Sequence, residues 1–243
     1  MKTQDLDVVY CIKDDPINEE LRYSLRSLQN LPHNKVWIYG AGPAWLDNVE
    51  HVRPRQNKGH KWLNARYMLE KIAQNNEITE DFIWLNDDFF IMREMHELYP
   101  WHDRDLEKRA NDFLGRGVWG GRSRYSIRLQ EAARALKACK HPYLNFELHT
   151  PIIFNRKKLR ETMRKYPDIG CIRSLYSNMW EPLSAQRNDV KIYDRHAYPN
   201  FQIDLLSTTD VSFERGKVGN YIRNNFKEKC AYEKEVDNER NTN

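Results

Sequence analysis

Short apolar runs separated by amphipathic stretches dominate the first half of the chain. The segments 6–12 and 35–40 are mostly apolar and rich in β-branched or aromatic side chains, and the segment 81–90 starts with another such run. Runs of this length are typical of strands that are buried on both faces. The segment 49–53 is a further candidate strand.

Two helices are predicted between these strands. A leucine series at helical spacing begins at Leu21, and Asn18 is a typical N-cap in front of two glutamates, so we expect an amphipathic helix over 18–30. A second apolar series that begins at Trp62 predicts a helix over 61–75. Strands and helices that alternate in this way predict an α/β fold with a mostly parallel central sheet.

The second half of the chain is less regular. The expected elements are helices over 104–114 and 127–139, a strand at 151–154, a helix that Asn155 caps, and a late strand at 201–206. The most economical interpretation is one domain over 1–226 with an α-rich insertion at about 100–145. The polar tail 227–243 is expected to fray.

The composition is that of a folded protein without a membrane span. The 243 residues include 40% hydrophobic and 12% aromatic side chains, which excludes extended disorder. No apolar run approaches the roughly 18–20 residues that a membrane helix needs, and residues 1–15 lack the apolar stretch of a signal peptide. The four cysteines form no CxxC pair, so we expect free thiols, no zinc site and a cytoplasmic location.

Basic residues exceed acidic ones by only 39 to 35, but they cluster locally. The segment 115–140 holds seven Lys and Arg residues and one acid, Glu131, while the segment 51–61 holds four basic residues and no acid. Such patches are typical of sites for phosphates, nucleotides or nucleic acids. Ordinary solvated surface is the alternative interpretation.

Pairs of acidic residues follow two of the predicted strands. Asp87 and Asp88 stand beside Asn86 directly after FIWL, and Asp14 and Asp15 follow the first strand. In an open parallel sheet, ligands bind where the carboxyl ends of the strands meet. Carboxylates at that edge can hold Mg²⁺ or Mn²⁺ against a diphosphate, and the next helix would add backbone N–H groups. An Asp pair at a turn or helix cap is the alternative.

Several segments together resemble the Stealth family of transferases. NEELRYSLRSLQNL at 18–31, KWLNARYMLEKI at 61–72 and FIWLNDDFF at 82–90 are similar to its first two conserved regions. FELHTPIIFNRKKL at 146–159 resembles the third region, and LLSTTDVSFERGKVGNYI at 205–222 resembles the last. The family includes bacterial capsular polysaccharide phosphotransferases and the eukaryotic enzyme that places N-acetylglucosamine phosphate on lysosomal glycoproteins.

The resemblance implies a GT-A-like, Rossmann-type fold that binds a nucleotide-diphospho-sugar, a UDP-sugar being one candidate. It also implies a divalent metal, Mg²⁺ or Mn²⁺, at Asp87 and Asp88. The residues that match its conserved positions and would bind the donor are Asn18, Glu20, Arg22, Asn64 and Asn86. His149 matches the third region and could take the proton of the acceptor hydroxyl, with Asp15 and Asp88 as rival bases.

Transfer of a sugar alone stands beside transfer of a sugar phosphate. The family continues its first strand into Trp-Val-Asp-Gly, whereas this chain has Cys-Ile-Lys-Asp at 11–14. This departure from the pattern leaves both reactions as interpretations of the resemblance.

The segment 115–128 suggests two kinds of acceptor. It interleaves aromatic residues with arginines, namely Trp119 and Tyr125 with Arg116, Arg122, Arg124 and Arg128. Arg122 and Arg124 are candidate phosphate ligands, because arginine forks bind phosphate with two hydrogen bonds. We expect a glycan acceptor, with hydroxylated bases of DNA as the alternative, since the arginines and the 51–61 cluster could track a phosphate backbone. A nucleic-acid-binding protein without catalysis and a degenerate family member are the other interpretations.

Overall fold

A computed structural model of the protein describes residues 1–13, 15–55, 59, 61–114, 123–181, 183–199 and 202–235. The strands are β1 (Asp7–Cys11), β2 (Val36–Tyr39), β3 (Glu50–Val52), β4 (Asp81–Leu85), β5 (Phe89–Ile91), β6 (Trp101–His102), β7 (Ile152–Asn155), β8 (Ala185–Gln186), β9 (Lys191–Ile192) and β10 (Leu205–Thr208). The helices are α1 (Glu19–Ser27), the 3₁₀ turn η1 (Leu28–Asn30), α2 (Lys61–Gln74), α3 (Leu106–Asn111), α4 (Arg124–Ala138), α5 (Arg156–Lys165), α6 (Ile172–Trp180), α7 (Asp210–Arg215) and α8 (Lys217–Asn225).

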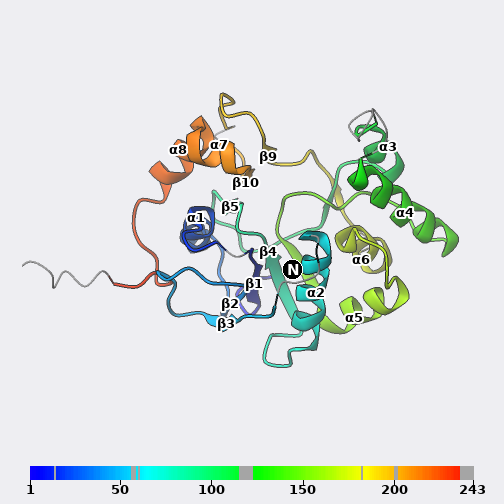
Figure 1. The fold of residues 1–243 in the computed structure, drawn as a ribbon, viewed down its shortest axis with the longest axis horizontal. Coiled ribbons are helices and arrows are strands. Elements are labelled where there is room, and N and C mark those ends of the chain that lie inside the picture. The colour runs from blue at the N-terminus through cyan, green and yellow to red at the C-terminus, as the bar shows by residue number, and fades with distance from the viewer. Residues whose placement is uncertain are drawn as a thin grey trace, which may run out of the picture.

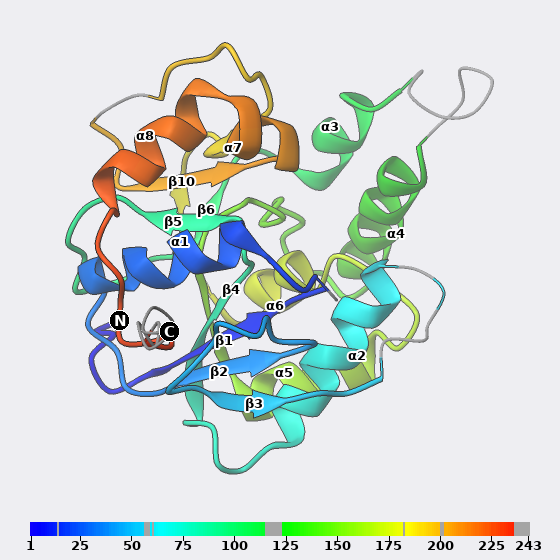
Figure 2. The same ribbon diagram turned by 60° about the vertical axis from the view of Figure 1, so that its left-hand side comes forward.

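The central sheet has the strand order β3-β2-β1-β4-β7. β1 pairs in parallel with both β2 and β4, and β3 continues the parallel part, whereas β7 runs antiparallel to β4 at the opposite edge. The predicted α/β class with a mostly parallel sheet is therefore confirmed. Because β1 and β4 are parallel neighbours, the segments that follow them leave the sheet at the same edge (Figure 2).

Alternate side chains of β1 enter two different cores. Val8 and Tyr10 are fully buried in a cluster with Leu21 and Leu25 of α1, whereas Val9 packs into the cluster that α2, α4, α5 and α6 share. Successive side chains of a strand point to opposite faces of the sheet. A strand covered on both faces has no polar side, which explains why its sequence is an unbroken apolar run.

The last strand of the chain forms a second, three-stranded sheet with β5 and β9. β10 pairs antiparallel with β5 and parallel with β9, and α7 and α8 pack beside this small sheet through a cluster that contains Phe90 and Phe213. In Figure 1 these elements lie with α1 on one side of the central strands, and α3 to α6 lie on the other side. The arrangement brings the end of β10 beside the end of β4, where the Thr208 amide donates to the Asp88 carbonyl at 3.3 Å.

Several elements differ from the sequence-based expectation. The late strand lies at 205–208 rather than 201–206, and the segment 81–90 forms two strands, β4 and β5, separated by residues 86–88. The segment 172–180 forms a helix that was not among the expected elements. Seven consecutive residues of that helix, 172–178, are buried, polar ones included. Its apolar residues Ile172, Leu175, Tyr176 and Met179 recur at helical spacing, so the sequence does carry the period of this helix.

The C-terminal tail packs against the domain beyond the predicted boundary. Arg26 of α1 donates from Nε and Nη2 to the two carboxylate oxygens of Glu233 at 2.6 and 2.8 Å, and from Nη1 to the Phe226 carbonyl at 3.0 Å. The prediction that the chain frays from residue 227 is therefore wrong for its described part, which runs to 235.

Among the described residues, no helix is both long and apolar enough to span a bilayer. The four cysteines carry free thiols.

Candidate functional site

The main cavity opens where the carboxyl ends of β1 and β4 meet, as the sequence predicted. Its volume is about 500 Å³, within the usual range for small-molecule sites. Side chains from both sides of the molecule surround it, so the cavity lies between α1, β9 and α7 on one side and α2, α4 and α6 on the other (Figures 1 and 2). The residues that line the cavity include Lys13, Glu20, Trp62, Asn86, Asp87, Asp88, Tyr125, Arg128, Glu147, His149, Gly170, Cys171, Arg173, Lys191 and Asp210.

Asn18 connects the start of α1 to the acidic motif. Its backbone has φ 38° and its side-chain oxygen accepts from the Leu21 amide at 3.0 Å, so it is the N-cap that the sequence predicted. Its side-chain Nδ2 donates to Asp87 Oδ2 at 2.9 Å. Asn18 is buried, so its side chain has little freedom to move. Its hydrogen bond therefore also holds the Asp87 carboxylate in place.

Lys191 of β9 neutralises the second carboxylate of the motif. Its Nζ lies 2.7 Å from Asp88 Oδ2, and the side chains of both residues are 14% exposed. Ser207 Oγ also donates to Asp88 Oδ2, at 3.3 Å. The small C-terminal sheet thus delivers a cation and a hydroxyl to a carboxylate that follows β4.

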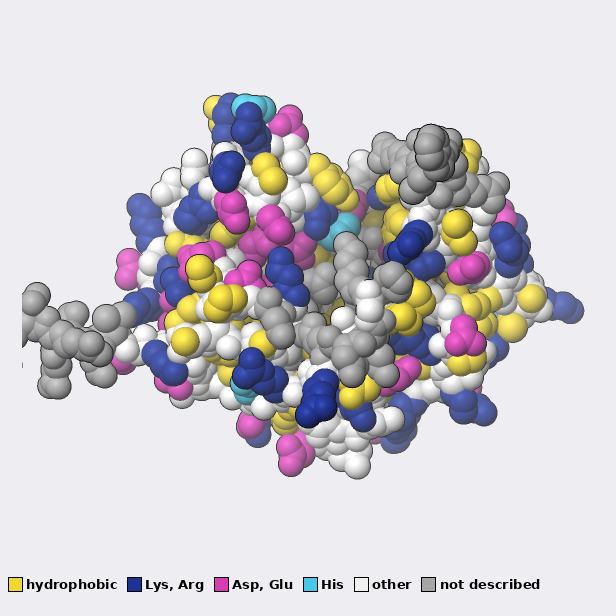
Figure 3. Space-filling view, in the orientation of Figure 1, with side chains coloured by type: hydrophobic (Ala, Val, Ile, Leu, Met, Phe, Trp, Pro, Cys, Tyr) yellow, Lys and Arg dark blue, Asp and Glu magenta, His cyan; other side chains and the backbone are white. Residues whose placement is uncertain are grey.

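Carboxylates crowd together on this side of the cavity, which we call the acidic side: Glu20, Asp87, Asp88 and Asp210. Burial, with smaller contributions from the neighbouring carboxylates, raises the pKa of Glu20 to about 7, although Thr208 Oγ1 donates to its Oε1 at 2.7 Å. Burial also raises the pKa of Asp87 to about 6, against the hydrogen bond from Asn18. A space-filling view shows acidic side chains gathered at the centre of this face (Figure 3).

The acidic motif fits a divalent cation that takes part of its ligands from a substrate. Among the described residues no group of three or more His, Cys, Asp or Glu side chains could hold a metal ion by itself. Mg²⁺, however, commonly uses one or two protein carboxylates and completes its shell with phosphate oxygens and water. Asn18 donates to Asp87 Oδ2, and Lys191 donates to Asp88 Oδ2. The two carboxylates are therefore held in place, and carboxylate oxygens are the ligands that such a cation takes.

His149 is held by a carboxylate at the edge of the cavity. Its Nδ1 lies 2.7 Å from Asp189 Oδ2, and its backbone amide donates to Asp189 Oδ1 at 2.9 Å. Burial acts to raise the pKa of Asp189, but the hydrogen bonds from His149 act against burial, and the pKa of Asp189 lies below its usual value. With Nδ1–H donated to the carboxylate, Nε2 of a neutral imidazole is the nitrogen that can accept a proton.

Arginines and aromatic rings form the opposite side of the cavity. The Arg128 guanidinium lies 5.3 Å from the Trp62 ring centroid and 5.8 Å from that of Tyr125. Arg173, which is buried, donates from Nε to the Phe146 carbonyl at 3.0 Å, and burial lowers its pKa to about 10. We call Trp62, Tyr125, Arg128 and Arg173 the arginine side.

Six of the predicted site residues come together at the cavity or touch its lining. They are Asn18, Glu20, Asn86, Asp87, Asp88 and His149.

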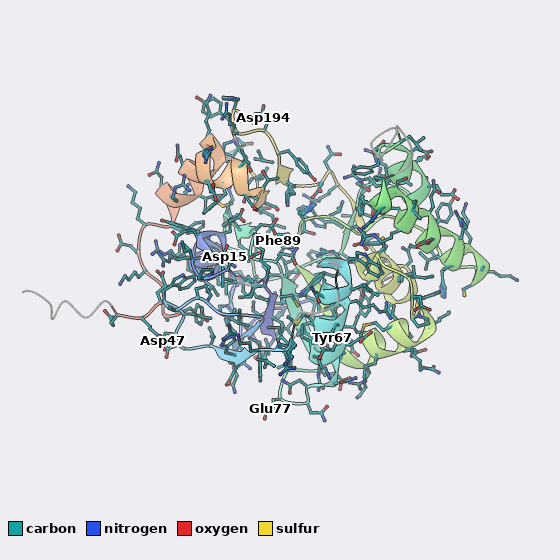
Figure 4. The ribbon with its side chains drawn as sticks, in the orientation of Figure 1. Asp15, Asp47, Tyr67, Glu77, Phe89 and Asp194 are labelled. Atoms are coloured by element: carbon teal, nitrogen blue, oxygen red, sulfur yellow. The ribbon has the colours of Figure 1, made fainter. Side chains whose placement is uncertain are left out.

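The structure uses Asp15 as a turn residue and places it outside this cavity. Its Oδ1 accepts from the amides of Ile17 and Asn18, each at 3.0 Å, and the Asn18 amide lowers the pKa of the Asp15 carboxyl. It lines a smaller neighbouring cavity of about 210 Å³. In Figure 4, Asp15 and Phe89 lie on the α1 side and Tyr67 lies on α2. Asp15, one of the predicted rival bases, therefore lies beside the main cavity and not among its lining residues.

Arg22 faces the C-terminal segment instead of the cavity. Its Nη1 lies 2.9 Å from Glu19 Oε1, its Nε lies 3.6 Å from Glu233 Oε2, and its guanidinium stacks 4.7 Å from the Trp45 ring centroid. Glu20 lines the cavity, and Arg22 follows it by two residues on the same helix. With 3.6 residues per turn, the two side chains point about 160° apart. The position of Arg22 therefore does not agree with the predicted role in donor binding.

Two other predicted donor ligands, Arg124 and Asn64, do not line the cavity. Arg124 is exposed at the start of α4, and Tyr125 and Arg128, which share one helix face, line the cavity instead. Asn64 lies on α2 but is not among the lining residues, which on that helix include Trp62 and Ala65. Arg122 lies outside the described residues.

Sequence reasoning missed several polar residues of the site. Lys191 and Asp189 lie in a segment without an apolar period or a recognisable motif, and the apolar spacing of α6 does not reveal the role of Arg173. Lys191 and Arg173 reach the cavity because β9 joins the small sheet and α6 is buried beside the large one, and Asp189 bonds to His149. The sequence indicates Arg128 only as one arginine of the basic segment 115–128, and the structure places it within α4.

No family model and no curated protein sequence matches the chain. Among solved structures, the galactosyltransferase LgtC in complex with donor and acceptor sugar analogues aligns with a TM-score of 0.47 at 12% identity, covering 91% of this chain and 95% of that chain. The bifunctional glycosyltransferase WbbM aligns with 0.47 at 13%, covering 90% and 43%. Mouse xyloside xylosyltransferase 1 aligns with 0.42 at 10%, covering 86% and 99%. Scores of this size do not establish a relationship, so we argue function from the residues of the cavity.

Proposed function

We propose that this protein transfers a sugar from a nucleotide-diphospho-sugar to a hydroxyl group of a glycan, as a GT-A-like member of the Stealth family. The observation that supports the proposal is the convergence of Asn18, Asp87 and His149 around one cavity. They come from three distant segments, each of which resembles a different part of that family. A cavity of about 500 Å³ suits a ligand of nucleotide-sugar size.

The acidic side would receive the donor diphosphate. Asp87 and Asp88 would hold Mg²⁺ or Mn²⁺, which when bound supplies positive charge against the diphosphate as it leaves. Lys191 and Lys13 add fixed positive charge from β9 and from the segment after β1. Asn18 keeps the Asp87 carboxylate in place, and the free amides at the start of α1 favour negative charge nearby.

His149 would act as the base toward the acceptor. Nε2 of the neutral imidazole takes the proton of the acceptor hydroxyl, while Asp189 holds the ring through Nδ1 and stabilises the imidazolium. The acceptor oxygen forms a bond to the anomeric carbon as the bond from that carbon to the diphosphate oxygen breaks. The nucleoside diphosphate leaves with that electron pair.

Transfer of a sugar phosphate would use the same residues with a different bond. The acceptor oxygen would then attack the phosphorus next to the sugar, and a nucleoside monophosphate would leave. We favour sugar transfer because the segment at 11–14 departs from the family pattern at this edge of the cavity.

A DNA acceptor has less support than a glycan. It rested on basic residues at 51–61 and 115–128, parts of which lie outside the described residues. Of the described ones, Arg128 lines the cavity, so it is not part of an outer track for a phosphate backbone.

The released nucleotide tests the proposal directly. The purified protein is incubated with a panel of nucleotide sugars and mixed glycan acceptors, with Mn²⁺ or Mg²⁺ and with excess chelator. We expect nucleoside diphosphate release that requires the cation and is lost in Asp88→Asn, but retained in the exposed control Arg134→Gln. Monophosphate release would show sugar-phosphate transfer, and the absence of both products would contradict the proposal.

A further inference from the structure

The arginine side of the cavity holds a guanidinium whose Nε finds no acceptor in the described part of the chain. Arg128 Nε is buried and has no hydrogen-bond partner among the described residues. The other arginines of the lining differ from it. Arg66 donates from Nε, Nη1 and Nη2 to Glu70, Ile169 and Met163, and Arg173 donates to Phe146 and Thr150. These two arginines bind the protein itself, whereas Arg128 lines the cavity and finds no acceptor for its Nε among the described residues.

The neighbours of Arg128 fix it in place without neutralising it. Trp62 and Tyr125 lie within 5.3 and 5.8 Å of its guanidinium carbon, and the rings of Tyr125 and Phe113 meet edge to face at 5.0 Å. A Cβ atom at Gly170 would lie 3.1 Å from Arg128 Cδ, so the glycine leaves room for the arginine stem. Aromatic faces attract a cation but accept no conventional hydrogen bond in the plane of the guanidinium.

A carboxylate that lines the same cavity is already engaged. Glu147 also lines the cavity, and its Oε1 accepts from the Ser174 amide at 2.9 Å, at the start of α6. An amide at a helix N-terminus is a favourable partner for a carboxylate. Glu147 is therefore accounted for by α6, and no ion pair joins it to Arg128 in the described part of the chain.

We propose that Arg128 is an anion subsite, and that the acceptor glycan carries a carboxylate or phosphate group that binds there. This inference rests on the proposed function, because the donor diphosphate is assigned to the acidic side and the arginine side is left for the acceptor. A planar guanidinium binds either anion with two parallel hydrogen bonds. Trp62 and Tyr125 add aromatic surface next to the anion, which suits the apolar face of a sugar ring.

Binding of simple sugars tests the subsite without any turnover. The full-length protein is titrated with methyl glucuronide, with glucose 6-phosphate and with neutral methyl glucoside, and binding is followed by calorimetry and by tryptophan fluorescence, since Trp62 and Trp84 line the cavity. We expect at least one anionic sugar to bind about tenfold more tightly than the glucoside. The preferred anion distinguishes a uronic acid from a sugar phosphate.

Two variants on α4 make the test specific. Arg128→Gln should abolish the preference for the anionic sugar, and Arg128→Lys should retain only part of it, because an ammonium lacks the fork. Arg134→Gln removes the same charge from an exposed position of the same helix and should bind all three sugars as the wild-type protein does. Melting temperatures check that each variant is folded.

Three outcomes would overturn the subsite. They are equal binding of charged and neutral sugars, an unchanged preference in folded Arg128→Gln, and no binding of either anionic sugar to the wild-type protein. Titration with uridine diphosphate and Mn²⁺ is run separately. Failure of that titration alone would count against the proposed donor site, while the sugar titrations would still decide the anion subsite.

Discussion

Lys191 Nζ lies 2.7 Å from Asp88 Oδ2, and neither side chain is more than 14% exposed. The two residues are far apart in the sequence and meet because β9 and β10 pack beside the end of β4. An ion pair this well shielded holds both side chains in one geometry, and removal of one partner leaves the other charge poorly compensated. The second carboxylate of the acidic motif is therefore paired with a lysine of the protein itself.

The ion pair predicts competition between Lys191 and a divalent metal. In Lys191→Met the Asp88 carboxylate loses its partner, so we expect Mn²⁺ to bind about tenfold more tightly, while turnover falls because the diphosphate loses a cation. Mn²⁺ affinity is measured by calorimetry. Lys13→Met is the control, because Lys13 is 60% exposed and pairs with Asp210 at 3.7 Å, and its effect on Mn²⁺ should be smaller. Equal Mn²⁺ affinity of wild type and Lys191→Met would contradict the competition.

Asp189 is predicted to act only through His149. In Asp189→Asn the imidazole loses the carboxylate at Nδ1, so we expect kcat to fall roughly 100-fold or more while the donor KM stays nearly constant. His149→Gln should have a similar effect, and the double variant should be little worse than either single one, since the two residues work as a unit. Steady-state kinetics of the three variants test this. Multiplicative losses would show that the residues act independently.

The C-terminal anchor is predicted to stabilise the fold without contributing to binding. Glu233→Gln breaks the buried pair with Arg26, which typically costs about 3–5 kcal/mol, so the melting temperature should fall by roughly 10 °C. Nucleotide affinity of the folded protein should not change, because Glu233 does not line the main cavity. Glu235→Gln removes a nearby exposed carboxylate and should melt like wild type. An equal melting temperature for Glu233→Gln would mean that the segment is not anchored.

Glu20 should make the metal-free protein less stable as the pH rises. Its pKa is raised to about 7 in the folded protein, mainly by burial, from an ordinary value of 4.5, so the folded state binds the proton more tightly than the unfolded state. Its contribution to stability is therefore complete below about pH 4.5 and is lost as the pH rises through 7.

A neutral side chain at this position should remove that pH dependence. We expect Glu20→Gln to melt a few degrees above wild type at pH 8 and close to it at pH 5, in buffer with chelator. Glu19→Gln is the control, because Glu19 is 41% exposed and pairs with Arg22 on the surface. Thermal unfolding followed by circular dichroism gives the comparison. A stability difference that does not change between pH 5 and pH 8 would argue against a raised pKa at Glu20.

The sequence by itself determined the elements of the first half and the edge at which the site lies. The apolar runs before Lys13 and Asn86 are too short for typical helices, and their length predicts buried strands. Asn18 was recognisable as an N-cap because an asparagine side chain can accept from the backbone amide three residues on. Local patterns of this kind act over a few residues, so they can be read directly from the sequence. They placed Asp87 and Asp88 at the carboxyl edge of the sheet.

Only the tertiary structure decided which polar side chains face the cavity. Arg22 and Glu20 lie on one helix, yet Arg22 packs on Trp45 while Glu20 reaches Thr208, because β10 and the C-terminal segment cover different faces of α1. Lys191 carries no sequence signal of its role, and the pattern at 115–128 does not distinguish Arg128 from the other arginines of that segment. A lysine or arginine is compatible with any exposed position. Its function depends on which distant segments pack beside it. Those contacts are long-range, so the local sequence pattern does not contain them.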